Sequence, residues 1–193
     1  MKFSPLLSSA TFLSILVAAP AMAHTGHGAA TGLQAGLTHP FTGLDHMLAM
    51  LAIGVWAAMQ KKSQQLSIPF AFLIFLGVGF ALAINGAVLP FIEQTIAASV
   101  LIGGLIIATT ARLPAAISLT LTMLFALAHG QAHGLEAASG STLLFALGFI
   151  GSSAILHFTG MVALATNRWI TPRITHYAGL MLAGIGSYLF LAA

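Results

Sequence analysis

The stretch IPFAFLIFLGVGFALAINGAVL, residues 68–89, contains no charged side chain along its whole length. A helix of about 20 residues, rising 1.5 Å per residue, crosses the roughly 30 Å hydrocarbon core of a bilayer. Lipid offers no partner to backbone N–H and C=O groups, so a segment of this kind must be helical. Five further apolar segments lie at 40–59, 95–111, 114–135, 141–165 and 174–191. The sequence therefore predicts an all-α membrane protein with six transmembrane helices.

The composition of the whole chain agrees with a membrane location. Of 193 residues, 59% are hydrophobic and 5% are charged, whereas about a quarter are charged in ordinary soluble domains. The chain has no cysteine, which excludes disulfides, thiolate metal ligands and cysteine nucleophiles. We expect the lipid bilayer as a partner and no nucleic-acid partner, and the sequence leaves the oligomeric state open.

The first residues have the features of a secretory signal peptide. A short apolar run follows the positive charge of Lys2, and AMA at residues 21–23 matches the small-x-small cleavage pattern. An uncleaved first helix is the alternative, but the run is short for a membrane span. We expect cleavage after Ala23, so that residues 1–23 form the signal peptide and residues 24–193 form a single transmembrane domain.

Basic residues set the expected orientation. A cleaved leader leaves the mature N-terminus in the periplasm, and six spans return the C-terminus to the same side. All five mature cations then fall on the cytoplasmic side, as the positive-inside rule requires. They are Lys61, Lys62, Arg112, Arg168 and Arg173. We therefore expect a multi-pass protein of the bacterial inner membrane with both termini periplasmic.

A polar motif, THPFTGLDHM, opens the first predicted span. Pro40 suits the first position of a helix, so His39 is expected at the outer mouth of this span. His39 and His46 are two helical turns apart and would share one face. Asp45 would point about 100° away from His46. It could bind a metal if the helix is distorted near Gly43, or it could orient a ligand histidine.

A second polar motif, HGQAHGLE, closes the fourth predicted span. His129, His133 and Glu136 have i, i+4, i+7 spacing and line one helix face. Spans one and four are antiparallel, and we expect them to pack together. His46 would then lie level with His129, and His39 would lie level with His133 and Glu136. The spacing predicts a site in the outer third of the membrane, with three or four imidazoles and one or two carboxylates.

These side chains have the chemistry of a transition-metal site. Imidazole with carboxylate suits Ni, Co, Zn or Cu(II) and disfavours Ca and Mg, which prefer oxygen ligands alone. An ionisable group inside a membrane costs on the order of 3 kcal/mol, so we interpret the cluster as functional rather than structural. The candidate metal residues are His39, Asp45, His46, His129, His133 and Glu136.

Three other polar residues have simpler interpretations. Glu93, in the predicted outer loop between spans two and three, is either a solvated charge or a metal-capture residue at the entrance. His157 and His176 are lone histidines in spans five and six, and we expect them to hydrogen-bond neighbouring helices. Marking a polar route to the cytoplasm is the alternative for these two residues.

Both motifs resemble signatures of the HupE/UreJ family of nickel permeases. The resemblance lies in HPFTGLDHMLAM at 39–50, continuing to GVWA at 54–57, and in FALAHGQAHGLE at 125–136. The leader, the six spans and the length also match, so the resemblance covers essentially the whole chain. It implies uptake of nickel or cobalt for hydrogenase, urease or cobalamin needs. It also implies that the metal residues are His39, Asp45, His46, His133 and Glu136, with His129 in the same motif.

We therefore expect a secondary transporter for Ni²⁺ or Co²⁺ rather than an enzyme. The chain has no G-x-x-x-x-G-K-[ST] run, so the membrane potential or a proton gradient is the expected energy source. An intramembrane zinc-dependent hydrolase that activates water is one alternative. A metal-binding accessory membrane protein is another. No prosthetic group is expected, because the metal ion is the cargo, and nickel and cobalt accept the same ligands.

Overall fold

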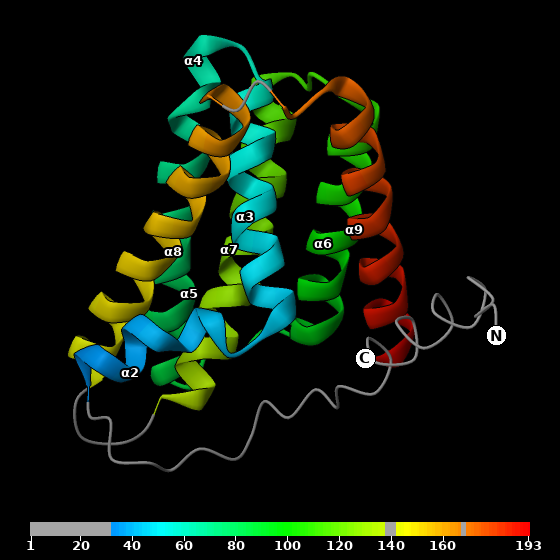
Figure 1. The fold of residues 1–193 in the computed structure, drawn as a ribbon. Helices are drawn as coiled ribbons and strands as arrows, with labels where there is room; N and C mark the ends of the chain where they lie inside the picture. The colour runs from blue at the N-terminus through cyan, green and yellow to red at the C-terminus, as the bar shows by residue number, and fades with distance from the viewer. Residues whose placement is uncertain (1–31, 138–141, 167–168) are drawn as a thin grey trace, which may run out of the picture.

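The computed structural model describes residues 32–137, 142–166 and 169–193, and within these ranges it is helical, with no strand. The predicted signal peptide, residues 1–23, and Arg168 lie outside the described residues. The elements are α2 (Leu33–Thr38), the 3-10 turn η1 (His39–Phe41), α3 (Leu44–Met59), α4 (Lys62–Gln65), α5 (Ser67–Ile84), α6 (Ile92–Thr109), α7 (Ala115–Glu136), α8 (Thr142–Thr166) and α9 (Pro172–Ala192). The long helices form a bundle in which α3, α6 and α8 run one way and α5, α7 and α9 the other (Figure 1).

Five described helices are long and apolar enough to cross a membrane: α5 together with α4, α6, α7, α8 and α9. A sixth span requires α3 to be combined with α2 and η1, and this pair is bent by 83°. The expected span from Pro40 is therefore not one continuous helix, and the distortion near Gly43 that the motif left open is present. Gly43 has an extended backbone (φ −101°, ψ 118°) that interrupts the helical hydrogen bonds. Pro40 instead lies at the start of the 3-10 turn, whose geometry it fits equally well.

The other helix boundaries differ from the predicted ones by a few residues. Helix α5 ends at Ile84 rather than near residue 89, because Asn85 leaves the helix and Gly86 adopts a left-handed backbone (φ 80°). Helix α6 begins at Ile92, so Glu93 lies in its first turn and not in a loop. Helix α9 begins at a proline, and the Thr171 hydroxyl accepts a hydrogen bond from the Ile174 N–H as its cap.

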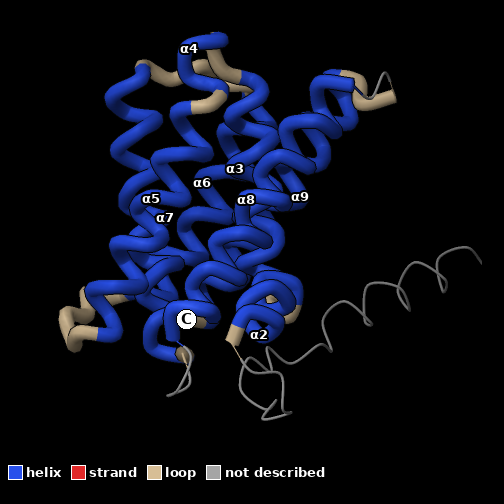
Figure 2. Tube along the Cα trace, turned by 90° about the vertical axis from the view of Figure 1, so that its left-hand side faces the viewer, coloured by secondary structure: helices blue, strands red, loops and turns tan. Residues whose placement is uncertain are grey.

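The helices pack mainly as pairs: α5 with α7, α6 with α9, and α3 and α2 with α8 (Figure 2). Spans one and four meet through their histidine side chains rather than through close backbone contact among the described residues. Helix α3 lies against α8 and α6, whereas α7 lies mainly against α5 and also against α6. Small residues allow two of these close contacts. A Cβ at Gly130 would collide with the backbone of α5, and one at Gly54 with the backbone of α8.

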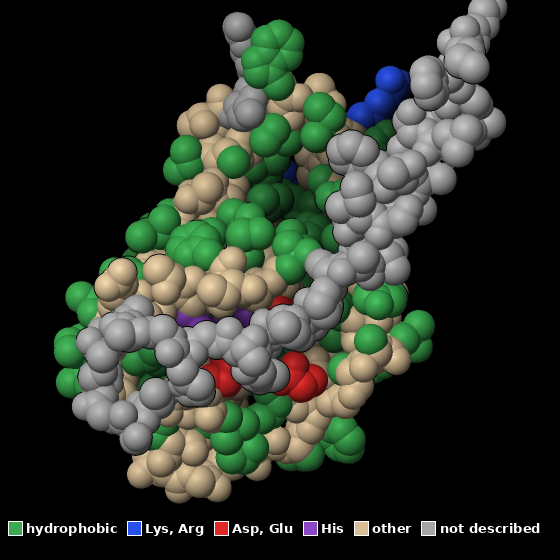
Figure 3. Space-filling model, turned by 60° about the horizontal axis from the view of Figure 1, so that its bottom comes forward, with side chains coloured by type: hydrophobic (Ala, Val, Ile, Leu, Met, Phe, Trp, Pro, Cys, Tyr) green, Lys and Arg blue, Asp and Glu red, His purple; other side chains and the backbone are tan. Residues whose placement is uncertain are grey.

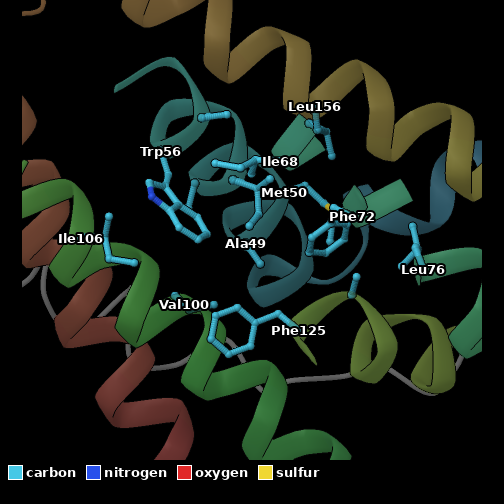
Figure 4. Close-up of a cluster of buried hydrophobic side chains, with 14 of the residues drawn as sticks. Ala49, Met50, Trp56, Ile68, Phe72, Leu76, Val100, Ile106, Phe125 and Leu156 are labelled. Carbon is cyan, nitrogen blue, oxygen red and sulfur yellow. The ribbon is translucent and has the colours of Figure 1, made fainter. Parts of the chain in front are cut away.

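Charged side chains separate to the two ends of the bundle. The acidic end carries Asp45 and Glu93, in the first turns of α3 and α6, and Glu136, the last residue of α7. The basic end carries the described cations, namely Lys61, Lys62, Arg112 and Arg173. The bundle interior between the ends is mostly apolar, with Met50, Phe72 and Phe125 in one buried cluster (Figure 4).

Candidate metal centre

Histidine and acidic side chains gather at the acidic end, where Figure 3 shows them close together on the surface. The outermost members are His39, from η1, and Glu136, from α7. Nε2 of His39 lies 2.8 Å from Oε2 of Glu136, and these side chains are 25% and 27% exposed. The bend before α3 turns η1 toward the end of α7, and so brings together residues 97 positions apart in the chain.

The His133 ring lies directly inward of this pair. Its centre is 4.7 Å from the centre of the His39 ring, and the residue is 2% exposed. His39, His133 and Glu136 offer ligand atoms that all lie within 4.8 Å of one another. Two atoms that bind one ion at about 2.1 Å must lie within about 4.2 Å of each other. A closure of less than an ångström would therefore let these three side chains hold one divalent ion.

Two more imidazoles continue inward from His133. The His46 ring is 4.7 Å from the His133 ring and 5.1 Å from the His129 ring, centre to centre. The four rings thus form a row in the order His39, His133, His46 and His129, which we call the histidine ladder. The expected match in depth between the two motifs is confirmed, with α3 and α7 meeting through these side chains rather than through close backbone contact. The rings bridge the space between the two helices.

Hydrogen bonds fix which ring nitrogens are free to bind a metal. Nδ1 of His129 lies 2.8 Å from the carbonyl oxygen of Phe125, so this nitrogen is the donor and Nε2 keeps its lone pair. Nδ1 of His46 lies 3.1 Å from Oδ1 of Asp45 and is oriented in the same way. Nε2 of both rings is buried and unpartnered within the described part of the chain, and so is Nδ1 of His133.

Unpartnered buried nitrogens of this kind are costly unless a ligand uses them, by roughly 1–3 kcal/mol each. Three of them lie in one row here, and together they could serve as ligands for a metal ion. Asp45 occupies the orienting position, because it accepts hydrogen bonds from both the backbone N–H and the ring of His46. Metal-binding histidines are commonly held in this way, with a carboxylate that accepts from one ring nitrogen and leaves the other facing the metal.

Aromatic side chains surround part of the ladder, and no sequence motif predicted them. Phe145 and Phe149 of α8 lie 5.2 Å and 4.8 Å from the rings of His39 and His133, and Phe72 of α5 lies 5.6 Å from the ring of His129. A phenylalanine in an apolar helix carries no signal of its own. Only the helix pairing shows that these rings surround the histidines and limit the access of water.

Gln131 is a second residue whose role appears only in the structure. Its side chain is fully buried, accepts a hydrogen bond from the Leu89 N–H at 2.8 Å and donates one to the Ala87 carbonyl at 2.9 Å. It thereby fastens the connection between α5 and α6 to α7, beside the ladder. Its position between two candidate ligands in HGQAH was the available signal.

The remaining predicted residues lie outside the ladder. Glu93 is exposed at the acidic end. Nδ1 of His157 lies 2.8 Å from the carbonyl oxygen of Met50, and Nδ1 of His176 lies 3.0 Å from that of Ala108. The expectation that these two histidines hydrogen-bond neighbouring helices is confirmed.

Comparison with known proteins agrees with the two motifs. A family model described as HupE / UreJ protein matches residues 12–189. The chain is similar to Protein HupE of Rhizobium leguminosarum bv. viciae, with 36% identity over 171 residues that cover 88% of this chain and 87% of that protein. No solved structure matches the chain. Its membrane helices, its two histidine motifs and a match over nearly its whole length show that this chain belongs to the HupE/UreJ family.

Proposed function

We propose that this protein is a secondary transporter that carries Ni²⁺ or Co²⁺ into the cytoplasm across the bacterial inner membrane. The observation that carries this proposal is the histidine ladder. It begins at a partly exposed carboxylate–imidazole pair and continues inward through three imidazoles that keep unpartnered nitrogens. A site that only stores a metal needs one set of ligands. A row of overlapping ligands allows an ion to move from one set to the next.

Charge at the acidic end supports entry of a dication from that side. Glu136 pairs with His39 in the structure, and a metal ion would take the place of the proton that the two side chains share. Asp45 contributes a second negative charge behind His46. If the acidic end faces the periplasm, a membrane potential of 100 mV, negative inside, favours inward movement of a dication by about 4.6 kcal/mol. That energy is comparable to the cost of burying a charge.

Accumulation of radiolabelled nickel, in cells with and without the protein, tests the proposal. We expect cells with the protein to accumulate nickel faster than cells without it, at metal concentrations low enough to limit uptake in the cells without it. Cobalt should compete for the same route, because it accepts the same ligands. Equal uptake in both cells would reject the permease. Equal uptake combined with a metal-dependent hydrolytic activity of the purified protein would favour the intramembrane hydrolase.

The orientation is a separate prediction, motivated by the separation of charge between the acidic and basic ends. A reporter that is active only in the periplasm is expected to be active when fused after Ala193 and silent when fused after Lys62, because cations are retained in the cytoplasm. Cleavage after Ala23 would place the mature N-terminus on the same side as Ala193. The reverse reporter pattern would place the acidic end in the cytoplasm.

A further inference from the structure

The histidine ladder leaves one buried imidazole unexplained. His157 of α8 is fully buried, and its Nδ1 bonds to the Met50 carbonyl, which leaves the lone pair on Nε2. That nitrogen has no partner among the described residues. A hydrogen bond that joins two helices explains Nδ1, and it does not explain why Nε2 is buried without a partner among the described residues.

A second unpartnered polar atom lies one turn away on the same helix. Oγ of Ser153 is buried and makes no hydrogen bond within the described ranges, and the residue is fully buried. Residues 153 and 157 have i, i+4 spacing and therefore share one face of α8. A serine hydroxyl in a membrane helix commonly bonds to the carbonyl one turn earlier. The neighbouring Ser152 does so, since its Oγ lies 3.1 Å from the Gly148 carbonyl oxygen.

These two atoms lie on the inward continuation of the histidine ladder. Phe149 of α8 packs against His133 at 4.8 Å and so marks the depth of that ring. Helix α8 runs from there toward the basic end (Figure 1). Ser153 and His157 lie one and two turns beyond Phe149, about 6 Å and 12 Å further inward at 1.5 Å per residue.

Phe72 of α5 contacts both His157 and His129, the innermost histidine of the ladder. Its ring contacts both histidines, with centres 5.6 Å from His129 and 4.9 Å from His157. The two imidazoles thus share one aromatic neighbour. An ion that leaves His129 would pass this ring to reach His157.

We propose that Nε2 of His157 and Oγ of Ser153 form an inner binding position for the transported dication, one step beyond the histidine ladder. This inference rests on the proposed transport function and adds a second binding position along the route of the ion. The inner position has one imidazole and one hydroxyl, and none of the three acidic residues lies near it, because all are at the acidic end. It therefore binds the ion more weakly than the outer ligands do. Transport needs such a position, because an ion held tightly at every step does not leave.

The variant His157→Asn separates binding from packing. The asparagine amide nitrogen can take the place of Nδ1 and still donate to the Met50 carbonyl, whereas nothing replaces Nε2. We expect the maximal rate of nickel uptake to fall at least about tenfold at unchanged membrane abundance. The half-saturating nickel concentration, and nickel binding by the purified protein, should stay within about twofold of wild type, because the outer ligands are intact.

Ser153→Ala provides an independent variant with little risk to folding, because the hydroxyl it removes has no hydrogen-bond partner in the described part of the chain. We expect it to slow maximal uptake by about threefold. Ser152→Ala is the matched control, on the adjacent residue, whose hydroxyl already bonds the Gly148 and Phe149 carbonyl oxygens of its own helix at 3.1 Å and the Gly36 carbonyl oxygen of α2 at 3.5 Å. That control should transport at the wild-type rate. If His157→Asn fails to reach the membrane, the maximal uptake rates of Ser153→Ala and Ser152→Ala are compared instead, and that comparison tests the inner position.

The outcomes separate this inference from the proposed function. Wild-type rates in both His157→Asn and Ser153→Ala would overturn the inner position while leaving the permease intact. A raised half-saturating concentration with an unchanged maximal rate would place His157 among the outer ligands, and would also overturn it. Absence of nickel uptake by the wild-type protein would reject the proposed function, and the inner position with it.

Discussion

Replacing His133 with alanine is expected to reduce nickel uptake at limiting metal by at least tenfold, or about 1.4 kcal/mol of binding free energy. His133 is the central ring of the ladder and contacts both His39 and His46. It also belongs to the trio whose ligand atoms already lie close enough for one ion to hold them after a small closure. Its removal therefore breaks the row between the exposed outer pair and the two inner imidazoles. His46→Ala should have a similar effect.

Uptake at low and high metal separates two ways in which the alanine variants can fail. Weakened binding is rescued by excess nickel, whereas a blocked route is not. The matched control is His176→Ala, whose ring bonds the Ala108 carbonyl outside the ladder. It should retain uptake. Normal transport by both His133→Ala and His46→Ala at limiting metal, with all proteins equally abundant in the membrane, would show that the ladder does not carry the ion.

Replacing Gly130 with leucine is expected to have the largest effect on stability. Even a Cβ at this position would overlap backbone atoms of Leu76 and Phe80, so α5 would have to move away from α7. Overpacking of this kind costs roughly 1–3 kcal/mol, which corresponds to a melting temperature lower by roughly 2–12 °C in a protein of this size. The neighbouring His129 would shift with its helix, so uptake should fall as well.

Thermal unfolding of the purified protein in detergent measures this effect. The control is Gly151→Ala, because a Cβ at Gly151 of α8 meets no atom within 4 Å. Alanine also has the better helix propensity, so the control should unfold at or slightly above the wild-type temperature. A melting temperature of Gly130→Leu equal to that of the control would mean that α5 and α7 are not in close contact.

Two features of the candidate site were predictable from spacing alone. His129 and His133 are one turn apart, and their depth in α7 follows from the rise of a helix. The position of His46 near the start of an antiparallel segment then predicts the same depth, and its contacts with both rings confirm this. The orienting role of Asp45 was also predictable, because a carboxylate adjacent to a histidine can accept a hydrogen bond from the histidine ring.

The bend at Gly43 was not predictable by the same means. Pro40 is compatible with the first position of an α-helix and with a 3-10 turn, so the local sequence does not distinguish the two. The choice depends on α2, which packs against α8. His39 consequently meets Glu136 from a separate element rather than from two turns up the helix of His46. The contact between His39 and Glu136 is as expected, but His39 reaches it from the 3-10 turn η1 and not from the helix that carries His46.

The sequence by itself determined which segments are long and apolar enough to be membrane helices, how charge separates between their ends and at what depth the histidines of α3 and α7 lie. These properties depend on local length, local polarity and the fixed rise of a helix, so one segment at a time suffices. Only the tertiary structure decided which helices are neighbours: α7 lies against α5, and α3 against α8. In lipid no hydrophobic force selects a partner, so pairing follows from close fits at residues such as Gly130 and Gly54. Those fits involve two surfaces at once, and the approach of the ladder rings to one another depends on them.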